Sequence, residues 1–119
     1  MISTVLQVAL GGAIGASTRH LVGLAVAFPF GTLAVNVVGS LLMGLAFVAL
    51  AEKGLERWTP LLMVGILGGF TTFSAFSLDT LKLYEMGKLA AAGGYVLASV
   101  MLSIAGLALG VVIMRGLQG

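Results

Sequence analysis

The sequence predicts an all-α membrane protein with four transmembrane helices in one domain, residues 1–119. Hydrophobic residues make up 60% of the chain and charged residues only 8%. A soluble domain of this length could not cover so much apolar surface with six Lys and Arg and four Asp and Glu. The apolar residues also fall into four stretches of roughly 20 residues, the length that crosses a bilayer. The chain is therefore expected to be an integral, multi-pass membrane protein.

Short connections separate the four predicted helices, which cover about residues 3–27, 31–51, 58–84 and 89–114. The chain start lacks the basic region of a signal peptide, so it is expected to remain as the first helix. Pro29 ends that helix, and Pro60 suits the first turn of the third. A charged turn at 52–57 and charged residues around 82–88 mark the remaining connections.

The third predicted helix carries a break near the middle of the membrane, at about residues 68–72. Pro60 to Gly69 is ten residues. At about 1.5 Å each they climb roughly 15 Å, half of a ~30 Å hydrocarbon core. Gly68 and Gly69 permit backbone angles that release carbonyl oxygens, and those of residues 68–71 could coordinate a small cation. The alternative is a kink whose carbonyls are recaptured by the Thr71 and Thr72 hydroxyls.

Aromatic and polar side chains form tracks along three predicted helices. After the break they recur every three residues, at Phe70, Phe73 and Phe76 and at Thr71, Ser74 and Ser77. In the second and fourth helices they recur every four residues, at Thr32, Asn36 and Ser40 and at Tyr95, Ser99 and Ser103. Such repeats keep each set on one face of its helix. A lone Ser or Thr often bonds back within its own helix, but the amide of Asn36 needs several partners inside a membrane.

These tracks predict a path for a small ion. A bare monovalent ion in a low-dielectric medium costs on the order of tens of kcal/mol, so other donors must replace its water. Hydroxyls, the Asn36 amide and the positive ring edges of Phe73 and Phe76 would suit an anion. The ring faces would instead attract a cation, so these residues alone leave the sign of the ion open.

Basic residues divide evenly between the two predicted faces of the membrane. Lys53, Arg57 and Arg115 fall on the side of the termini, and Arg19, Lys82 and Lys88 fall on the other. The positive-inside rule then gives no preferred orientation. Either another determinant sets the topology, or the chain inserts both ways and forms an antiparallel homodimer. Arg19 is expected to snorkel from a helix end or to join an inward-facing ion pair.

Several other classes are disfavoured. The dispersed net charge of +2 does not indicate nucleic-acid binding, and a chain without Cys has no disulfide or thiolate metal site. No face gathers a nucleophile, a base and an orienting group, so no enzyme is expected. A small dual-topology proton-coupled multidrug exporter, the main alternative, needs a carboxylate within the membrane. All four acidic residues are expected at or near span ends: Glu52, Glu56, Asp79 and Glu85.

A purely structural membrane subunit is a further alternative. Small-residue spacings such as Gly11 with Gly15 and Gly106 with Gly110 would then be close-packing surfaces. This interpretation leaves Asn36 and the hydroxyl tracks without a role.

Three blocks of the sequence resemble the signature blocks of the Fluc (CrcB) family of fluoride channels. They occur in family order, and together they are far more specific than any one alone. The blocks are residues 12–19 (GAIGASTR), 31–40 (GTLAVNVVGS) and 65–77 (GILGGFTTFSAFS).

The resemblance implies a dual-topology homodimer in the inner (plasma) membrane. Two antiparallel pores would export toxic fluoride passively and so confer fluoride resistance. Phe73 and Phe76 resemble the pore aromatics, Asn36 the pore amide and Ser74 a pore hydroxyl. The remaining polar track would comprise Thr32, Tyr95, Ser99 and Ser103.

The resemblance also implies a structural sodium ion at the dimer interface. Gly68 and Thr71 resemble the residues whose backbone carbonyls hold that ion, and Arg19 corresponds to the arginine of the family's first helix. Three positions depart from the family pattern: Ala75 replaces a frequent hydroxyl residue, Asp79 a frequent Glu, and His20 a frequent Tyr.

Overall fold

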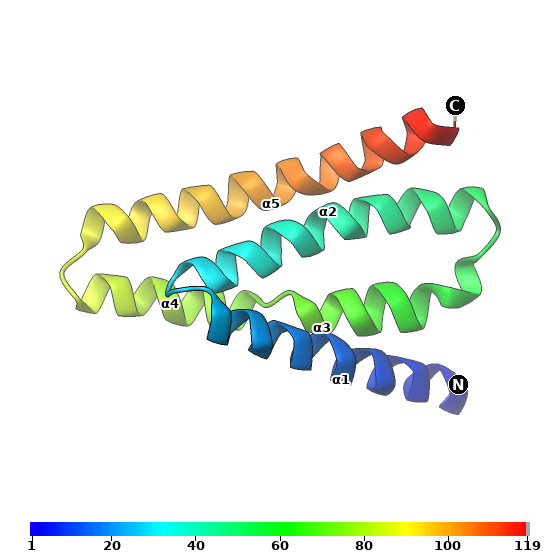
Figure 1. The fold of residues 1–119 in the computed structure, drawn as a ribbon, viewed down its shortest axis with the longest axis horizontal. Helices are drawn as coiled ribbons and strands as arrows, with labels where there is room; N and C mark the ends of the chain where they lie inside the picture. The colour runs from blue at the N-terminus through cyan, green and yellow to red at the C-terminus, as the bar shows by residue number, and fades with distance from the viewer. Residues whose placement is uncertain (119) are drawn as a thin grey trace.

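The computed structural model describes residues 1–118, which form helices joined by short turns (Figure 1). The elements are α1 (Ile2–Ala25), α2 (Phe30–Glu52), the 3₁₀ helix η1 (Glu56–Trp58), the π-helix η2 (Pro60–Leu67), α3 (Gly68–Phe70), α4 (Phe73–Glu85) and α5 (Leu89–Gln118). The all-α prediction is confirmed. The helices begin within two residues of the predicted starts, and the segment from η1 to α4 is the predicted broken helix.

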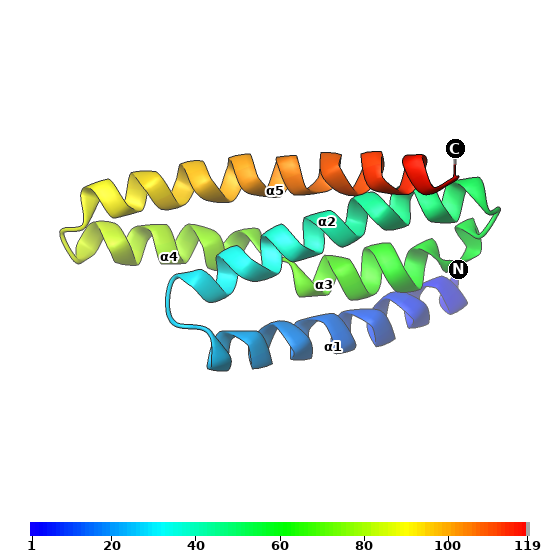
Figure 2. The same cartoon turned by 45° about the horizontal axis from the view of Figure 1, so that its top comes forward.

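The chain passes along the bundle four times in alternating directions, so both termini lie at the same end of the molecule (Figures 1 and 2). α2 and α5 run side by side in the same direction, while α1 lies along η2 and α3. In both views the turn between α1 and α2 lies well short of the turn between α4 and α5. The bundle is therefore thinner at that end, where α4 and α5 extend beyond the other helices.

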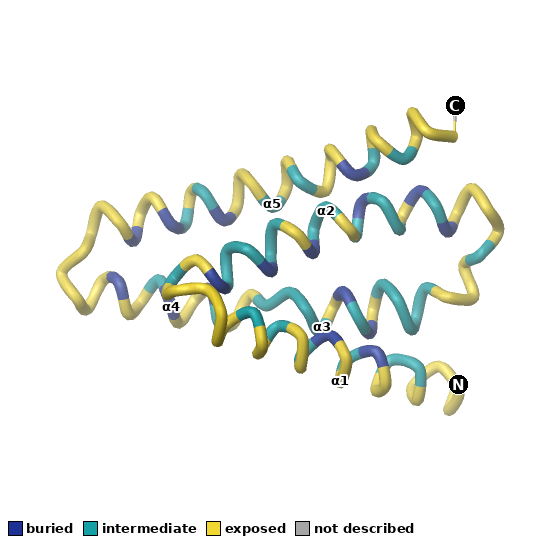
Figure 3. The backbone as a smooth tube through the Cα atoms, in the orientation of Figure 1, coloured by how far each residue is buried: buried dark blue, intermediate teal, exposed yellow. Residues whose placement is uncertain are grey.

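Three segments have the length and apolar character to cross a membrane: Phe30–Glu52, Glu56–Glu85 and Leu89–Gln118. α1 is not one of them, although it is 24 residues long. Its polar residues, including Gln7, Thr18 and Arg19, dilute its hydrophobicity. Exposed residues run along α1 and α5 (Figure 3), and many of them are large and apolar, as lipid-facing surfaces require.

The chain leaves helical geometry at Thr71 and Thr72, within the predicted range of the break. The predicted role of the glycines is wrong. Gly68 has the ordinary helical angles φ −62° and ψ −38°, and Gly69 lies inside α3. Gly69 is required for close packing instead, because a Cβ there would lie 2.9 Å from the carbonyl oxygen of Gly12.

Glycines also bring α1 against η2. A Cβ on Gly11 would lie 2.8 Å from the Ile66 nitrogen, and one on Gly15 would collide with the Ile66 carbonyl oxygen. Backbone atoms cannot move aside as a flexible side chain can. Small residues at such contacts are the usual means by which membrane helices approach closely.

Gly15→Ala is therefore expected to destabilise the protein by about 1–3 kcal/mol through overpacking. Gly12→Ala is the matched control, because a Cβ there meets nothing within 4 Å. Thermal unfolding of the purified variants in detergent measures the difference. Equal midpoints for the two variants would contradict this packing account.

Candidate functional site

The side chain of Asn36, from the middle of α2, holds the backbone of the break. The Thr72 N–H donates to Asn36 Oδ1 at 2.7 Å, and Asn36 Nδ2 donates to the Thr72 carbonyl at 3.0 Å. An uninterrupted helix would instead use the Thr72 N–H to bond the carbonyl of Gly68. Asn36 thus takes the donor that would have continued the helix, and the chain extends at Thr71 and Thr72.

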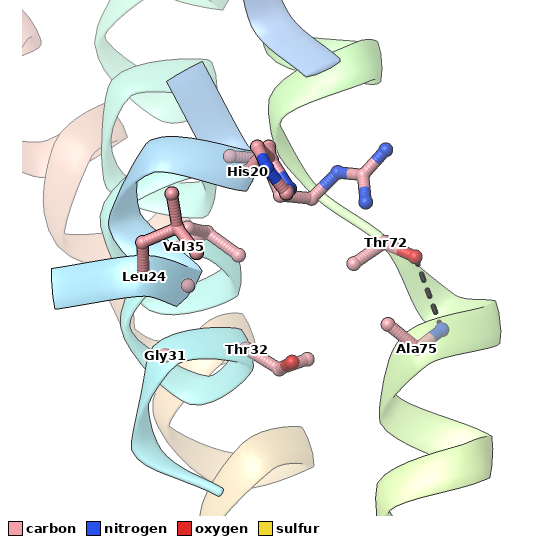
Figure 4. Close-up of a pocket in the computed structure, with 9 residues that line it drawn as sticks. His20, Leu24, Gly31, Thr32, Val35, Thr72 and Ala75 are labelled. Carbon is pink, nitrogen blue, oxygen red and sulfur yellow. Dashed lines mark hydrogen bonds between the residues drawn. The ribbon is translucent and has the colours of Figure 1, made fainter. Parts of the chain in front are cut away.

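The two threonine hydroxyls act on opposite sides of the break. Thr71 Oγ1 donates to the Leu67 carbonyl at 3.0 Å, which also accepts the Thr71 N–H at 3.1 Å, so this hydroxyl does not recapture a carbonyl of residues 68–71. Thr72 Oγ1 accepts from the Ala75 N–H at 3.1 Å and so caps α4, as the dashed line in Figure 4 shows. It also lies 3.2 Å from the hydroxyl of Ser74, which is exposed.

A groove of about 460 Å³ lies between α2, the break, α4 and α5. It brings together these predicted pore residues: Asn36, Phe73, Phe76, Ser99 and Ser103. The Oγ of Ser99 is buried and has no hydrogen-bond partner within residues 1–118. Such a hydroxyl is costly to bury unless it meets a ligand or water. The groove therefore has polar hydrogen-bonding groups and no charged side chain among its lining residues.

Three aromatic rings lie in sequence beside the groove. The rings of Phe73 and Phe76 meet edge to face, with centroids 5.3 Å apart and planes at 68°. Phe76 also contacts Tyr95, with centroids 5.4 Å apart. Phe76 is buried, at 8% exposure, whereas Phe73 is 76% exposed. Phe73 thus presents a large apolar surface directly after the break.

The other predicted pore residues do not line this groove. Ser74 lies beside Thr72. Tyr95 is buried among the side chains between α4 and α5, and its hydroxyl donates to Asp79 Oδ2 at 3.2 Å. Thr32 lines a second cavity of about 320 Å³, shown with His20, Thr72 and Ala75 in Figure 4. The side chains predicted to form one track are thus divided between two cavities and a buried contact.

Asp79, expected at or near a span end, lies on α4 six residues before Glu85, where the apolar segment Glu56–Glu85 ends. Its side chain is buried, at 8% exposure, which the sequence did not predict. The hydrogen bond from Tyr95 compensates part of the cost of burying its carboxyl group. The part of the chain that the structure describes therefore contains an acidic side chain buried between helices, near one end of a candidate span.

Arg19 forms no ion pair with another of residues 1–118, so the inward-facing ion pair, one of the two sequence-based expectations, is not found among them. Its side chain is half-buried, and its Nε donates to the carbonyl of Gly69 at 3.1 Å. The same side chain lines the second cavity beside His20 and Thr32. The sequence does not predict Gly69 as the partner of Arg19, because that contact depends on the relative register of α1 and α3.

Two backbone carbonyls at the break are candidates to hold a cation. The Thr71 carbonyl accepts no hydrogen bond from residues 1–118, and Gly68 loses its helical donor because Thr72 bonds Asn36. Side chains offer no substitute, since His, Asp and Glu form no metal-binding group of three within the same residues. Hard cations such as sodium prefer oxygen ligands, so the carbonyls predicted from the resemblance fit that ion.

The family model of "CrcB-like protein, Camphor Resistance (CrcB)" matches residues 6–111. The chain belongs to the CrcB-like family. It is 57% identical over 122 aligned positions to a protein of Cereibacter sphaeroides named "Fluoride-specific ion channel FluC", covering 98% of both chains. A Paracoccus denitrificans protein of the same name is 52% identical, with 96% of each chain covered. One from Rhodospirillum centenum is 46% identical, with 93% and 94% covered.

The CrcB-like match spans both the residues that form the break and the residues that line the groove. The resemblance stated from the three sequence blocks is confirmed. The relatives are named as channels, which agrees with the expectation that the chain is not an enzyme.

Proposed function

We propose that this CrcB-like protein is an integral membrane channel that conducts fluoride passively through the groove between α2, α4 and α5. The proposal is carried by near full-length identity to proteins named fluoride-specific ion channels. The groove supports it, because polar side chains and aromatic rings meet there without a fixed charge. An uncharged lining lets a small anion pass without being held tightly.

The lining can replace the water that fluoride loses. Ser99 supplies a buried hydroxyl without a protein partner, and Ser103 supplies a second hydroxyl one helical turn away. One Nδ2 hydrogen of Asn36 is used by Thr72, which leaves the other for the groove. The edges of Phe73 and Phe76 carry positive potential and complete the set of contacts for an anion.

Fluoride efflux from liposomes tests this function and separates it from the exporter alternative. Purified protein is reconstituted with fluoride and chloride inside the vesicles, and each ion is followed with a selective electrode. A channel releases fluoride, retains chloride and does so at the same rate with or without a proton gradient. Retention of fluoride, or release only with a proton gradient, would contradict passive conduction. The gradient matters because Asp79 is buried within α4.

We further propose an antiparallel homodimer that contains two pores. The exposed ring of Phe73 beside the break and the groove open to the surface support an additional protein surface at this position. The even distribution of basic side chains supports insertion in both orientations.

Labelling of Lys53→Cys tests dual insertion, because the natural chain has no Cys and Lys53 lies in the exposed turn after α2. A membrane-impermeant thiol reagent is expected to label about half of the molecules from each side of the membrane. Labelling from one side alone would reject dual topology.

The proposed structural sodium would be bound by the carbonyls of Gly68 and Thr71 from each subunit. When bound, it would be coordinated by these free carbonyl oxygens and would join the two chains at the break. Replacing sodium with a large organic cation is expected to lower the thermal midpoint of the dimer. An unchanged midpoint over a wide sodium range would contradict a structural role for this ion.

A further inference from the structure

Two side chains from outside the broken helix hold its backbone on either side of the break. Asn36 of α2 bonds both the N–H and the carbonyl of Thr72. Arg19 of α1 donates to the carbonyl of Gly69. The carbonyls that these side chains leave free include the proposed cation ligands at 68 and 71. The shape of the break thus depends on contacts from α1 and α2 rather than on its own glycines, which are helical.

The contact of Arg19 uses the inner nitrogen of its side chain. Nε donates at 3.1 Å, and none of residues 1–118 forms a hydrogen bond or an ion pair with the two terminal nitrogens. A half-buried guanidinium without a countercharge is costly. If only a donor for Gly69 were needed, an uncharged group at the position of Nε would serve.

We propose that Arg19 is a positioning residue for the break. Its Nε–H holds the Gly69 carbonyl and thereby fixes α3 against α1, and its positive charge is not what conduction requires. This inference rests on the proposed fluoride conduction for one of its two readouts. It adds a role for Arg19 that neither the groove nor the cation site includes, because Arg19 lines only the second cavity.

Two substitutions separate the donor from the charge. Arg19→Gln places an amide nitrogen as many bonds from Cα as Nε, but it is uncharged. Arg19→Lys keeps the charge but has a carbon at that position, and its ammonium lies one bond further out and is strongly hydrated. Arg19→Met has neither a donor nor a charge. These variants have side chains of similar length, so they change the chemistry more than the volume.

The first readout is fluoride efflux from liposomes. Arg19→Gln is expected to keep at least about half of the natural rate, whereas Arg19→Lys and Arg19→Met lose about tenfold, as expected for a lost buried hydrogen bond. Equal losses in Arg19→Gln and Arg19→Lys, or a faster rate in Arg19→Lys, would overturn the proposal. Retention in Arg19→Lys alone would mean that Arg19 acts through its charge, for example by attracting anions to the second cavity.

The second readout is hydrogen exchange at the amide of Thr72, which does not depend on conduction. This amide bonds Asn36 at 2.7 Å only while the break keeps its shape. Protection comparable to that of the natural protein is expected in Arg19→Gln, and at least about tenfold faster exchange in Arg19→Met. Equal exchange in Arg19→Gln and Arg19→Met would overturn the proposal. This comparison does not need Arg19→Lys, so it still decides the question if that variant does not fold. If the natural protein releases no fluoride, the proposed function fails and this comparison alone decides the role of Arg19.

Discussion

Phe76→Ile is expected to abolish fluoride efflux from liposomes while the protein still assembles as a dimer. Isoleucine keeps an apolar group in the buried position but has no ring edge to face an anion. It also removes the contacts of Phe76 with Phe73 and Tyr95, whose ring centroids lie 5.3 Å and 5.4 Å away. Efflux should fall by at least about a hundredfold, which corresponds to roughly 2.7 kcal/mol of barrier.

Phe47→Ile is the matched control for this variant. The same replacement of Phe by Ile is made at Phe47 of α2, whose side chain is 55% exposed and is not among the residues that line the groove. This control should conduct at the natural rate, and size-exclusion chromatography should show both variants as dimers. Normal efflux through Phe76→Ile would remove Phe76 from the fluoride path.

Asn36→Asp is expected to reduce fluoride efflux by at least about tenfold. The carboxylate can still accept the Thr72 N–H, but it loses the Nδ2 donor to the Thr72 carbonyl and places an oxygen against that carbonyl. It also introduces negative charge into a groove that contains no charged side chain. The electrostatic barrier to an anion and the strain at the break act in the same direction.

Gln7→Glu provides a comparison with the same change from amide to acid. Gln7 lies on α1, where its amide bonds Ser3 of the same helix. Fluoride efflux through this control should be close to normal. Natural efflux through Asn36→Asp would show that the amide is not needed for conduction or for the shape of the break.

The helices could be predicted from the sequence because their signal is local. Membrane-length apolar stretches, with Pro and charged residues between them, define α2, the broken third span and α5. The break was also placed correctly, but its cause was not. Gly68 and Gly69 were assigned unusual backbone angles, whereas the break arises one helix away, from the side chain of Asn36.

The candidate site was only partly predictable. Repeats of three and four residues show which side chains share a helix face, and this placed Asn36, Phe76, Ser99 and Ser103 around one groove. The same repeats do not show how far one helix is shifted along another. Contacts that depend on this shift, such as Arg19 with Gly69 and Tyr95 with Asp79, were therefore missed.

Thr72 is the residue of the break whose contacts were least predictable from the sequence. Its backbone bonds Asn36 and its hydroxyl caps α4, so one residue links the break to both neighbouring helices. One signal was present in the sequence. A membrane-buried amide needs several partners, and an interrupted helix supplies free backbone groups, so Asn36 and the break could have been paired on chemical grounds.

Blocking the groove with a single thiol tests most directly whether fluoride passes through it. Ser103→Cys places the only Cys of the chain in the groove lining, and Leu117→Cys places one at a 76% exposed position outside it. Both variants are modified with a bulky thiol reagent, and mass spectrometry confirms complete reaction before fluoride efflux is measured. The account predicts that modification stops efflux through Ser103→Cys and leaves Leu117→Cys conducting. Undiminished efflux through fully modified Ser103→Cys would contradict it.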